Sequence, residues 1–200
     1  MLGLKKGTVR VVSYRPDWSR LFEQERRLLQ RHIGHLALDI QHVGSTAVPD
    51  LDAKPILDIA VTVDSVYVIP RLVGPLCRAG YADRGDKGRD GGHLFVKESA
   101  PEVRTHHVHV VAVDDPQWRE YLLFRDALRD DEALRARYAA FKRDLRERYP
   151  DDQSAYTAAK RTFVRDELLR QNGTWGGCAA PAARRHQGSA LLAGILSRNG

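Results

Sequence analysis

The stretch HVGSTAVPDLDAKPILDIAV, residues 42–61, contains a turn of small residues followed by an apolar run. The apolar run is rich in β-branched residues and predicts a strand over residues 55–63 that is covered on both faces. In the turn, Gly44 allows the backbone to approach a ligand closely, and the Ser45 and Thr46 hydroxyls suit a phosphate group. A tight turn without a ligand is the alternative interpretation.

One acidic residue interrupts the apolar run. Asp58 lies inside the expected strand, Ala60 follows it on the same face, and Lys54 stands just before the strand. A carboxylate in a strand covered on both sides costs several kcal/mol unless it is paired. Asp58 therefore requires a cation, a metal ion or several hydrogen-bond donors. A structural salt bridge to Lys or Arg is the alternative to a ligand site.

A second candidate strand, RTHHVHVV at residues 104–111, carries three histidines. Strand alternation places three of its residues on one face: Thr105, His107 and His109. His106 falls on the opposite face, where we expect it to be a hydrogen-bonded core residue. Two histidines beside Asp58 would supply a two-His, one-carboxylate metal site, or would hold an anion.

Length and composition restrict the class of protein. The chain has 200 residues, 42% of them hydrophobic and 29% charged, which is typical of a globular domain with a single core. It has two cysteines without metal-ligand spacing and no run of eighteen apolar residues, so we expect a cytoplasmic protein with no membrane partner. Residues 173–200 contribute three of the six net positive charges, which leaves a mildly basic body. We therefore expect a small anionic ligand and do not expect nucleic acid.

The first 114 residues mix strand and helix patterns. The expected elements are a strand at 8–14, a helix from an N-cap at Asp17 to Gly34, strands at 38–43 and 55–63, a helix that begins near Pro70 and is closed by Gly80, a loop at 82–92, and strands at 93–99 and 104–113. This pattern predicts an α+β fold with a mixed sheet and flanking helices.

From residue 115 the chain is charged, nearly free of glycine and periodic at helical spacing, which predicts helices at 116–129, 131–148 and 152–171. Tyr156 and Lys160 are four residues apart and share a helix face, where a phenol and an ammonium can line an anion pocket. We predict one domain over residues 1–172, with a sheet-bearing half at 8–114 and a helical half at 115–172. A flexible Gly- and Ala-rich tail is expected at 173–200.

Five segments occur in an order and spacing that resemble one family: VVSYRPDWSRLFEQE, the stretch at 42–61, RTHHVHVV, FRDALR, and YAAFKRDL followed by YPDDQSAYTAAKRTFV. This is the GrpB family of small bacterial proteins, some of which are fused to dephospho-CoA kinase. The resemblance covers about residues 8 to 170 and implies a nucleotidyltransferase-like fold with a C-terminal helical region. The residues assigned to ligand binding, from the patterns and the resemblance together, are His42, Gly44, Ser45, Thr46, Lys54, Arg104, Arg125, Lys142, Tyr156 and Lys160.

In active nucleotidyltransferases the serine of the turn grips phosphate, while an Asp-x-Asp pair and a third acid bind magnesium. Here Ser45 matches the serine and Asp58 the first acid, but Ala60 occupies the second acid position. A single acid facing a His-rich strand is a poor magnesium cage. One metal ion, a different metal, or metal-free anion binding all remain open. The turn also departs from the family pattern, with Asp50 where glycine is usual and with Asp52 as a further loop acid.

Three functions follow as expectations. The first is nucleotidyl transfer, or activation of a carboxylate as an adenylate, with ATP or another nucleoside triphosphate and a divalent ion (Mg²⁺, Mn²⁺ or Zn²⁺). Asp58 with His107 and His109 would hold the metal, or a histidine would act as general base. The second is a non-catalytic binding or partner module with a degenerate metal site. The third is a biosynthetic enzyme for cyclisation or group transfer by histidine acid/base chemistry. A homodimer is compatible with all three.

Overall fold

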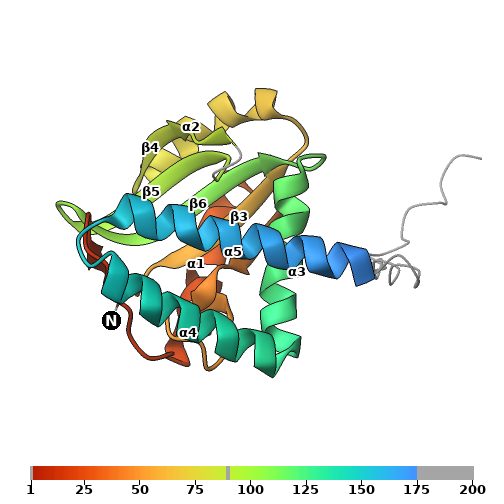
Figure 1. Cartoon of the computed structure of the whole chain (residues 1–200). Coiled ribbons are helices and arrows are strands. Elements are labelled where there is room, and N and C mark those ends of the chain that lie inside the picture. The colour runs from red at the N-terminus through yellow and green to blue at the C-terminus, as the bar shows by residue number, and fades with distance from the viewer. Residues whose placement is uncertain (1, 89–90, 175–200) are drawn as a thin grey trace, which may run out of the picture.

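The computed structural model describes residues 2–88 and 91–174 of the chain, and Figure 1 shows how its helices surround a central sheet. The strands are β1 (Leu4–Lys5), β2 (Ala37–Val43), β3 (Leu57–Val63), β4 (Tyr81–Asp86), β5 (His93–Ala100) and β6 (Val103–Ala112). The helices are α1 (Asp17–Ile33), α2 (Ile69–Arg78), α3 (Pro116–Asp130), α4 (Glu132–Arg148) and α5 (Gln153–Thr174), with short 3₁₀ turns η1 (Ser45–Ala47) and η2 (Val66–Val68).

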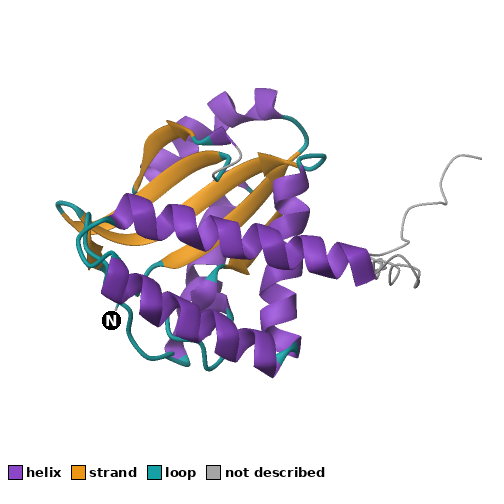
Figure 2. Ribbon diagram, viewed as in Figure 1, coloured by secondary structure: helices purple, strands orange, loops and turns teal. Residues whose placement is uncertain are grey.

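The sheet is mixed, as the sequence predicts. Its strand order is β2-β3-β6-β5-β4, with the short β1 paired to β6. The central pair β3 and β6 is parallel, and every other pair is antiparallel (Figure 2). The two strands that carry the candidate site residues are therefore direct neighbours in the middle of the sheet. A Gly-Ser turn ahead of an acid-bearing strand, in a mixed sheet with flanking helices, is the nucleotidyltransferase-like arrangement that the resemblance implied.

One face of the sheet packs against α1 and α2. Alternate residues of β3 and β6, such as Ile59 and Val108, are fully buried there against Trp18 and Leu72. Burial of apolar side chains contributes about 1.5 to 3 kcal/mol for each large residue, so this layer is the main core of the protein. The period of two along each strand then directs Asp58 and the residues in register with it to the opposite face.

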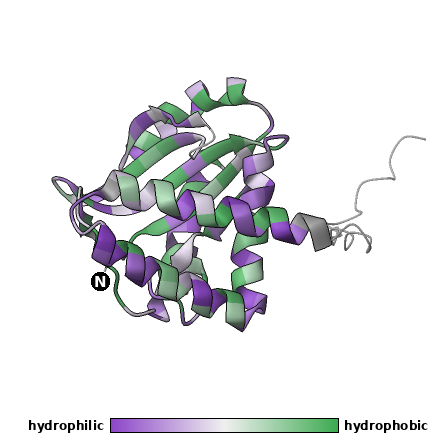
Figure 3. Cartoon of the chain, viewed as in Figure 1, coloured by the Kyte–Doolittle hydropathy of each residue, from purple (hydrophilic) through white to green (hydrophobic). Residues whose placement is uncertain are grey.

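The opposite face of the sheet is turned toward the helical half. In Figure 1, α5 crosses in front of the sheet and α4 lies below it. These helices carry both hydrophobic and hydrophilic residues along their length (Figure 3). Val48 and Leu51, from the loop after the Gly-Ser turn, pack with Leu128, Leu134 and Tyr138 in a second apolar cluster. This cluster fixes the loop, and thereby the turn, against α3 and α4.

Each helix of the helical half begins beside an aspartate that caps its free N–H groups. Asp115 accepts from Gln117 N, Asp131 accepts from Leu134 N, and Asp152 accepts from Ala155 N, all at 2.9 Å. The three predicted helices are thus confirmed to within three residues at each end. Asp50 has a positive φ, 61°, at the position where the family pattern usually has glycine.

Three local predictions were wrong. Residues 8–14 form no named strand and contribute only an isolated bridge from Val12 to Ala53. The expected loop at 82–92 contains most of β4, an edge strand whose outward charges hide the usual apolar alternation. Asp17 is the first residue of α1 and not its N-cap, which is Pro16. The predicted tail lies mostly outside the described residues. Among those described, no helix is long and apolar enough to cross a membrane.

Candidate functional site

The site is centred on Asp58, which the parallel pairing of β3 and β6 places beside two histidines. Asp58 is in register with His107, and Ala60 is in register with His109. Asp58 Oδ1 lies 3.1 Å from His107 Nδ1 and 3.6 Å from His109 Nε2. The sequence expectation that these three residues share one face of the sheet is therefore met in space.

Burial of the Asp58 carboxyl opposes its ionisation, but the contacts with His107 and His109 outweigh that effect and hold its pKa well below its ordinary range. Its side chain remains 34% exposed, so a ligand has access to the carboxylate. A single ionised acid beside two imidazoles is a different charge pattern from a cluster of carboxylates, and it attracts a metal ion less strongly by charge alone.

The Gly-Ser turn fits closely over this carboxylate. Gly44 has φ 69°, a conformation that residues with a Cβ rarely adopt. A Cβ at this position would lie 2.7 Å from Asp58 Oδ2. Glycine is therefore required both by the backbone angle and by the approach of the turn to the acid.

Contacts with Gly91 and Tyr121 fix the orientation of the His109 ring. Its Nδ1 lies 3.0 Å from the Gly91 carbonyl oxygen, and the Tyr121 ring packs against it at 5.6 Å between centroids. With Nδ1 beside the Gly91 carbonyl oxygen, Nε2 is the nitrogen of His109 that faces Asp58. His107 Nε2 is buried and has no hydrogen-bond partner among the described residues.

These atoms fit a metal ion. Asp58, His107 and His109 each offer a ligand atom, and the three atoms lie within 4.8 Å of one another. Two imidazole nitrogens and one carboxylate oxygen suit Zn²⁺, Mn²⁺ or Fe²⁺ better than Mg²⁺, which prefers oxygen ligands. The His109–Gly91 hydrogen bond is the kind of outer contact that orients metal-binding histidines.

A buried lysine from the helical half reaches the Gly-Ser turn. Lys142 of α4 is 3% exposed, and its Nζ lies 3.2 Å from Ser45 Oγ and donates to the Asp52 carbonyl oxygen. Its ammonium also lies 4.8 Å from the centre of the Tyr138 ring. Burial, helped by the nearby charge of Lys160, lowers the pKa of Lys142 to about 7.

Two further lysines flank Tyr156 of α5. Lys54 Nζ lies 4.5 Å from the centre of the Tyr156 ring, and Lys160 Nζ lies 5.5 Å from it. Burial and the charge of Lys160 lower the pKa of Lys54 to about 8, although the Asp58 carboxylate opposes this effect. No ion pair among residues 2–88 and 91–174 neutralises Lys54, Lys142 or Lys160.

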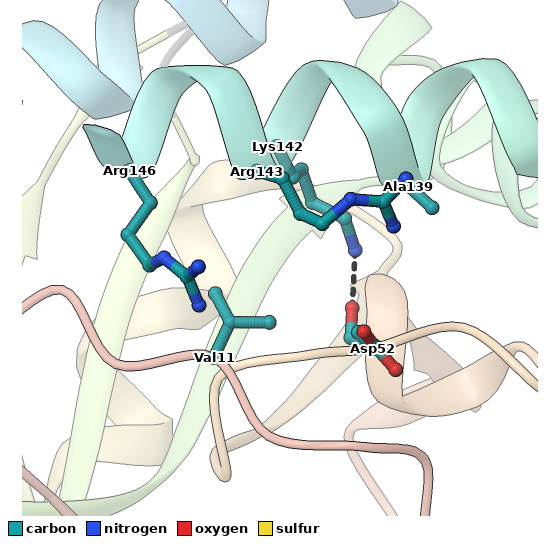
Figure 4. Close-up of a pocket in the computed structure, with 6 residues that line it drawn as sticks. All are labelled: Val11, Asp52, Ala139, Lys142, Arg143 and Arg146. Carbon is teal, nitrogen blue, oxygen red and sulfur yellow. Dashed lines mark hydrogen bonds between the residues drawn. The ribbon is translucent and has the colours of Figure 1, made fainter. Parts of the chain in front are cut away.

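A small pocket opens where α4 meets the segment around Val11. Figure 4 shows that Arg143 and Arg146 extend along it from α4, and that Lys142 bonds to Asp52 across it. Its lining is Val11, Asp52, Ala139, Lys142, Arg143 and Arg146. The turn side of α4 is therefore lined largely by cations.

The family model described as "GrpB protein" matches residues 8–170. The chain belongs to the GrpB family. The glutamate-rich protein GrpB of Alkalihalophilus pseudofirmus is 38% identical over 174 residues, which cover 86% of this chain and 99% of the relative. The crystal structure of GrpB from Enterococcus faecalis superimposes with a TM-score of 0.72 at 33% identity, covering 82% of this chain and 99% of that one.

Family membership leaves the activity open. A dephospho-CoA kinase of Mycolicibacterium paratuberculosis is 33% identical over 190 residues, but the match spans 84% of this chain and only 47% of the kinase. The GrpB chain thus spans about half the length of that relative. The kinase name describes the relative as a whole.

Four residues predicted to bind ligand lie apart from the Asp58 cluster or hold backbone in place. His42 stacks on Phe22 of α1 at 4.7 Å and bonds through Nε2 to Thr46 Oγ1 at 3.0 Å. Burial lowers the pKa of His42 to about 4, as expected for a neutral core histidine. Arg104 lies near Glu98, on the α1 face of the sheet. Arg125 donates to the side chain of Gln41 and to the backbone carbonyl of His42, which ties α3 to β2.

Sequence reasoning missed Tyr138, Tyr121 and Gly91. A signal for Tyr138 was available, because Tyr138 precedes Lys142 by four residues, the same spacing that drew attention to Tyr156 and Lys160. Nothing local indicated Tyr121 or Gly91. Their contacts with His109 depend on how α3 and the loop after β4 pack over the sheet.

Proposed function

We propose that this GrpB-family protein is a metal-dependent transferase that acts on a phosphorylated small molecule, a nucleotide being the first candidate. The observation that carries the proposal is the convergence of Asp58, His107 and His109 directly beneath a Gly-Ser turn that faces the buried Lys142. Neither half alone would indicate transfer chemistry. Together they supply one place for a metal ion and an adjacent place for an anion.

The proposed anion-binding part of the site is a group of lysines without carboxylate partners among the described residues. Lys54 and Lys142 are both desolvated and lack carboxylate partners among the described residues, so each is costly without a bound anion. Lys160 lies close enough to lower the pKa of both. A phosphate group between them would relieve this repulsion, and Ser45 would add a hydrogen-bond donor.

The metal side would be held by Asp58 Oδ1, His107 Nδ1 and His109 Nε2. A bound divalent ion would supply charge neutralisation and polarisation of a phosphoryl oxygen. The protein's own contribution is positional: Gly44 brings the turn against the carboxylate, and Gly91 fixes the orientation of His109. Lys54 and Lys160 would hold the rest of the anion and neutralise charge that develops during transfer.

A thermal-shift experiment tests this proposal. ATP with Mn²⁺ or Zn²⁺ should raise the melting temperature of the wild type by roughly 5 to 10 °C at 100 times the dissociation constant. Asp58→Asn should abolish the metal-dependent part of the shift. Asp83→Asn is the matched control. Asp83 Oδ1 lies 2.7 Å from His93 Nε2, and this Asp–His pair is separate from the Asp58 site. Equal shifts in wild type and Asp58→Asn would refute the metal role.

A second function is favoured by the Asp58–His107 pair itself. A carboxylate bonded to a histidine Nδ1 orients the imidazole as general base catalysis without a metal requires, and a substrate would have to reach the buried His107 Nε2. Small-molecule cyclisation or group transfer would use that chemistry on a carboxylated substrate. Stabilisation by small organic acids that persists in a chelator would favour this alternative, whereas no response to any ligand would favour a binding module.

A further inference from the structure

The hydroxyl of Ser45 lies beside a buried amine, which suits a chemical role in addition to phosphate binding. Ser45 follows Gly44 in the turn and is half-buried. The amine of Lys142, 97 residues away in sequence, lies 3.2 Å from its hydroxyl. The Tyr138 ring, one helical turn before Lys142, lies 4.8 Å from the same ammonium. The serine hydroxyl thus faces a buried amine, which the Tyr138 ring flanks on the same face of α4.

Lys142 is in a suitable state to accept a proton from this hydroxyl. It is almost fully buried, and no carboxylate among the described residues pairs with it. Its contact with the Asp52 carbonyl oxygen takes up an N–H group, so a neutral amine would still have its lone pair free for Ser45. Burial lowers the pKa of Lys142 to about 7, which makes the neutral form accessible near neutral pH.

We propose that Ser45 is a nucleophile and that Lys142 is its general base, so that Ser45 carries the transferred phosphoryl or nucleotidyl group as a covalent intermediate. The choice of a phosphorus electrophile rests on the proposed function. The Ser–Lys pairing itself rests on the geometry of the turn and α4. Serine–lysine pairs are a known solution for activating a hydroxyl without a histidine.

The proposed step balances in atoms and charge. The Ser45 oxygen forms a new bond to the phosphorus of a phosphoanhydride or activated phosphate ester, and its proton moves to Lys142 Nζ. The bond from phosphorus to the leaving group breaks, and that group, a phosphate, a pyrophosphate or the alkoxide of the ester, departs with the bonding electron pair. In the second half, an acceptor carboxylate attacks the phosphorus, or an acceptor hydroxyl attacks it and releases its proton to solvent. The bond from phosphorus to Ser45 breaks, and Ser45 recovers its proton from Lys142.

The surrounding charges suit this step. Lys54 and Lys160 both lie beside the Tyr156 ring and carry no ion pair among the described residues, so they are available to the leaving group. Asp58 adjoins Gly44 on the other side of the turn. A phosphorus atom at Ser45 would therefore lie between the carboxylate–histidine cluster and the cations.

A fluorophosphonate probe tests the nucleophile without needing the natural substrate or a metal ion. The Ser45 oxygen displaces fluoride from the probe, leaving a phosphonyl group that mass spectrometry can locate on the peptide. We expect the wild type to be labelled at Ser45. Ser45→Ala should lose that label, whereas Ser65→Ala, at the N-cap of η2, should keep it. Absence of label at Ser45 in a folded wild type would overturn the proposal.

The Lys142→Arg variant distinguishes two roles of Lys142, general base and anion-binding cation. Arginine keeps the positive charge but does not give up its proton, so a general-base role predicts that the labelling rate falls about 100-fold. Labelling of Lys142→Arg at the wild-type rate would overturn the proposal. Lys142→Ala with added methylamine is the second variant, and restored labelling of Ser45 is the expected result. Since labelling needs no metal, its outcome is independent of whether the metal-dependent transfer is right.

Discussion

Replacing Lys142 with methionine removes a buried amine while keeping a side chain of similar length. The pKa of the Lys142 amine falls from its ordinary 10.5 to about 7 in the folded protein. At about 1.4 kcal/mol for each pKa unit, this difference corresponds to about 5 kcal/mol. Burial is the main cause, so this amount is the free-energy cost of holding the charged amine inside the fold. The cost is fully present below pH 7, where Lys142 is charged in both states.

The sign of the pH dependence follows from proton binding. Between about pH 7 and pH 10.5 the unfolded chain binds the lysine proton and the folded chain does not, so the free energy of unfolding of the wild type rises with pH. The methionine variant lacks this contribution. The free energy of unfolding of the wild type minus that of Lys142→Met should therefore increase by about 4 kcal/mol from pH 7 to pH 10.

Urea unfolding at pH 7, 8, 9 and 10 measures this difference directly, because the other titrating groups are common to both proteins. Lys6→Met is the control, since Lys6 is exposed and its replacement should leave the pH dependence unchanged. A difference between wild type and Lys142→Met that is constant with pH, or that falls as pH rises, would show that the amine is not desolvated as described.

Three further changes have defined outcomes. Gly44→Ala should lower the free energy of unfolding by about 2 to 4 kcal/mol in urea, because the left-handed backbone and the contact with Asp58 both exclude a Cβ; a loss below 0.5 kcal/mol would contradict this. Glu25→Gln should cost about 2 kcal/mol in the same assay, since Lys97, 2.9 Å away and partly buried, loses its counter-charge; no change would mean that the pair is screened. Asp58 has a lowered pKa, so the stability it contributes is present above about pH 4 and is lost as the pH falls further. Acid titrations of wild type and Asp58→Asn should therefore converge at low pH, and parallel curves would argue against the ion pair.

The period of two in the strands made most of the site predictable. It placed His107 and His109 together and separated His106, which contacts Glu25 at 3.8 Å and packs beside Tyr81 on the α1 face. Alternation alone does not say which strands are neighbours. The structure shows that β3 pairs with β6 in parallel, which brings Asp58 Oδ1 to 3.1 Å from His107 Nδ1.

What the sequence did not reveal depends on contacts far apart in the chain. β4 carries charged residues because it is an edge strand, so its composition resembles a loop. His42 was assigned to the ligand side, yet it is in register with Ile59 and so faces α1. The contact of Lys142 with Ser45 spans 97 residues and arises only because Val48 and Leu51 anchor the turn to the helical half.

The most direct test of the central claim is the binding of Zn²⁺ or Mn²⁺ measured by titration calorimetry. The account predicts one ion per chain in the wild type and in the control His93→Gln. Asp58→Asn and His107→Gln should each weaken binding at least tenfold, because each removes one of the three ligands. Binding of equal affinity in Asp58→Asn and wild type would show that Asp58, His107 and His109 do not form the metal site.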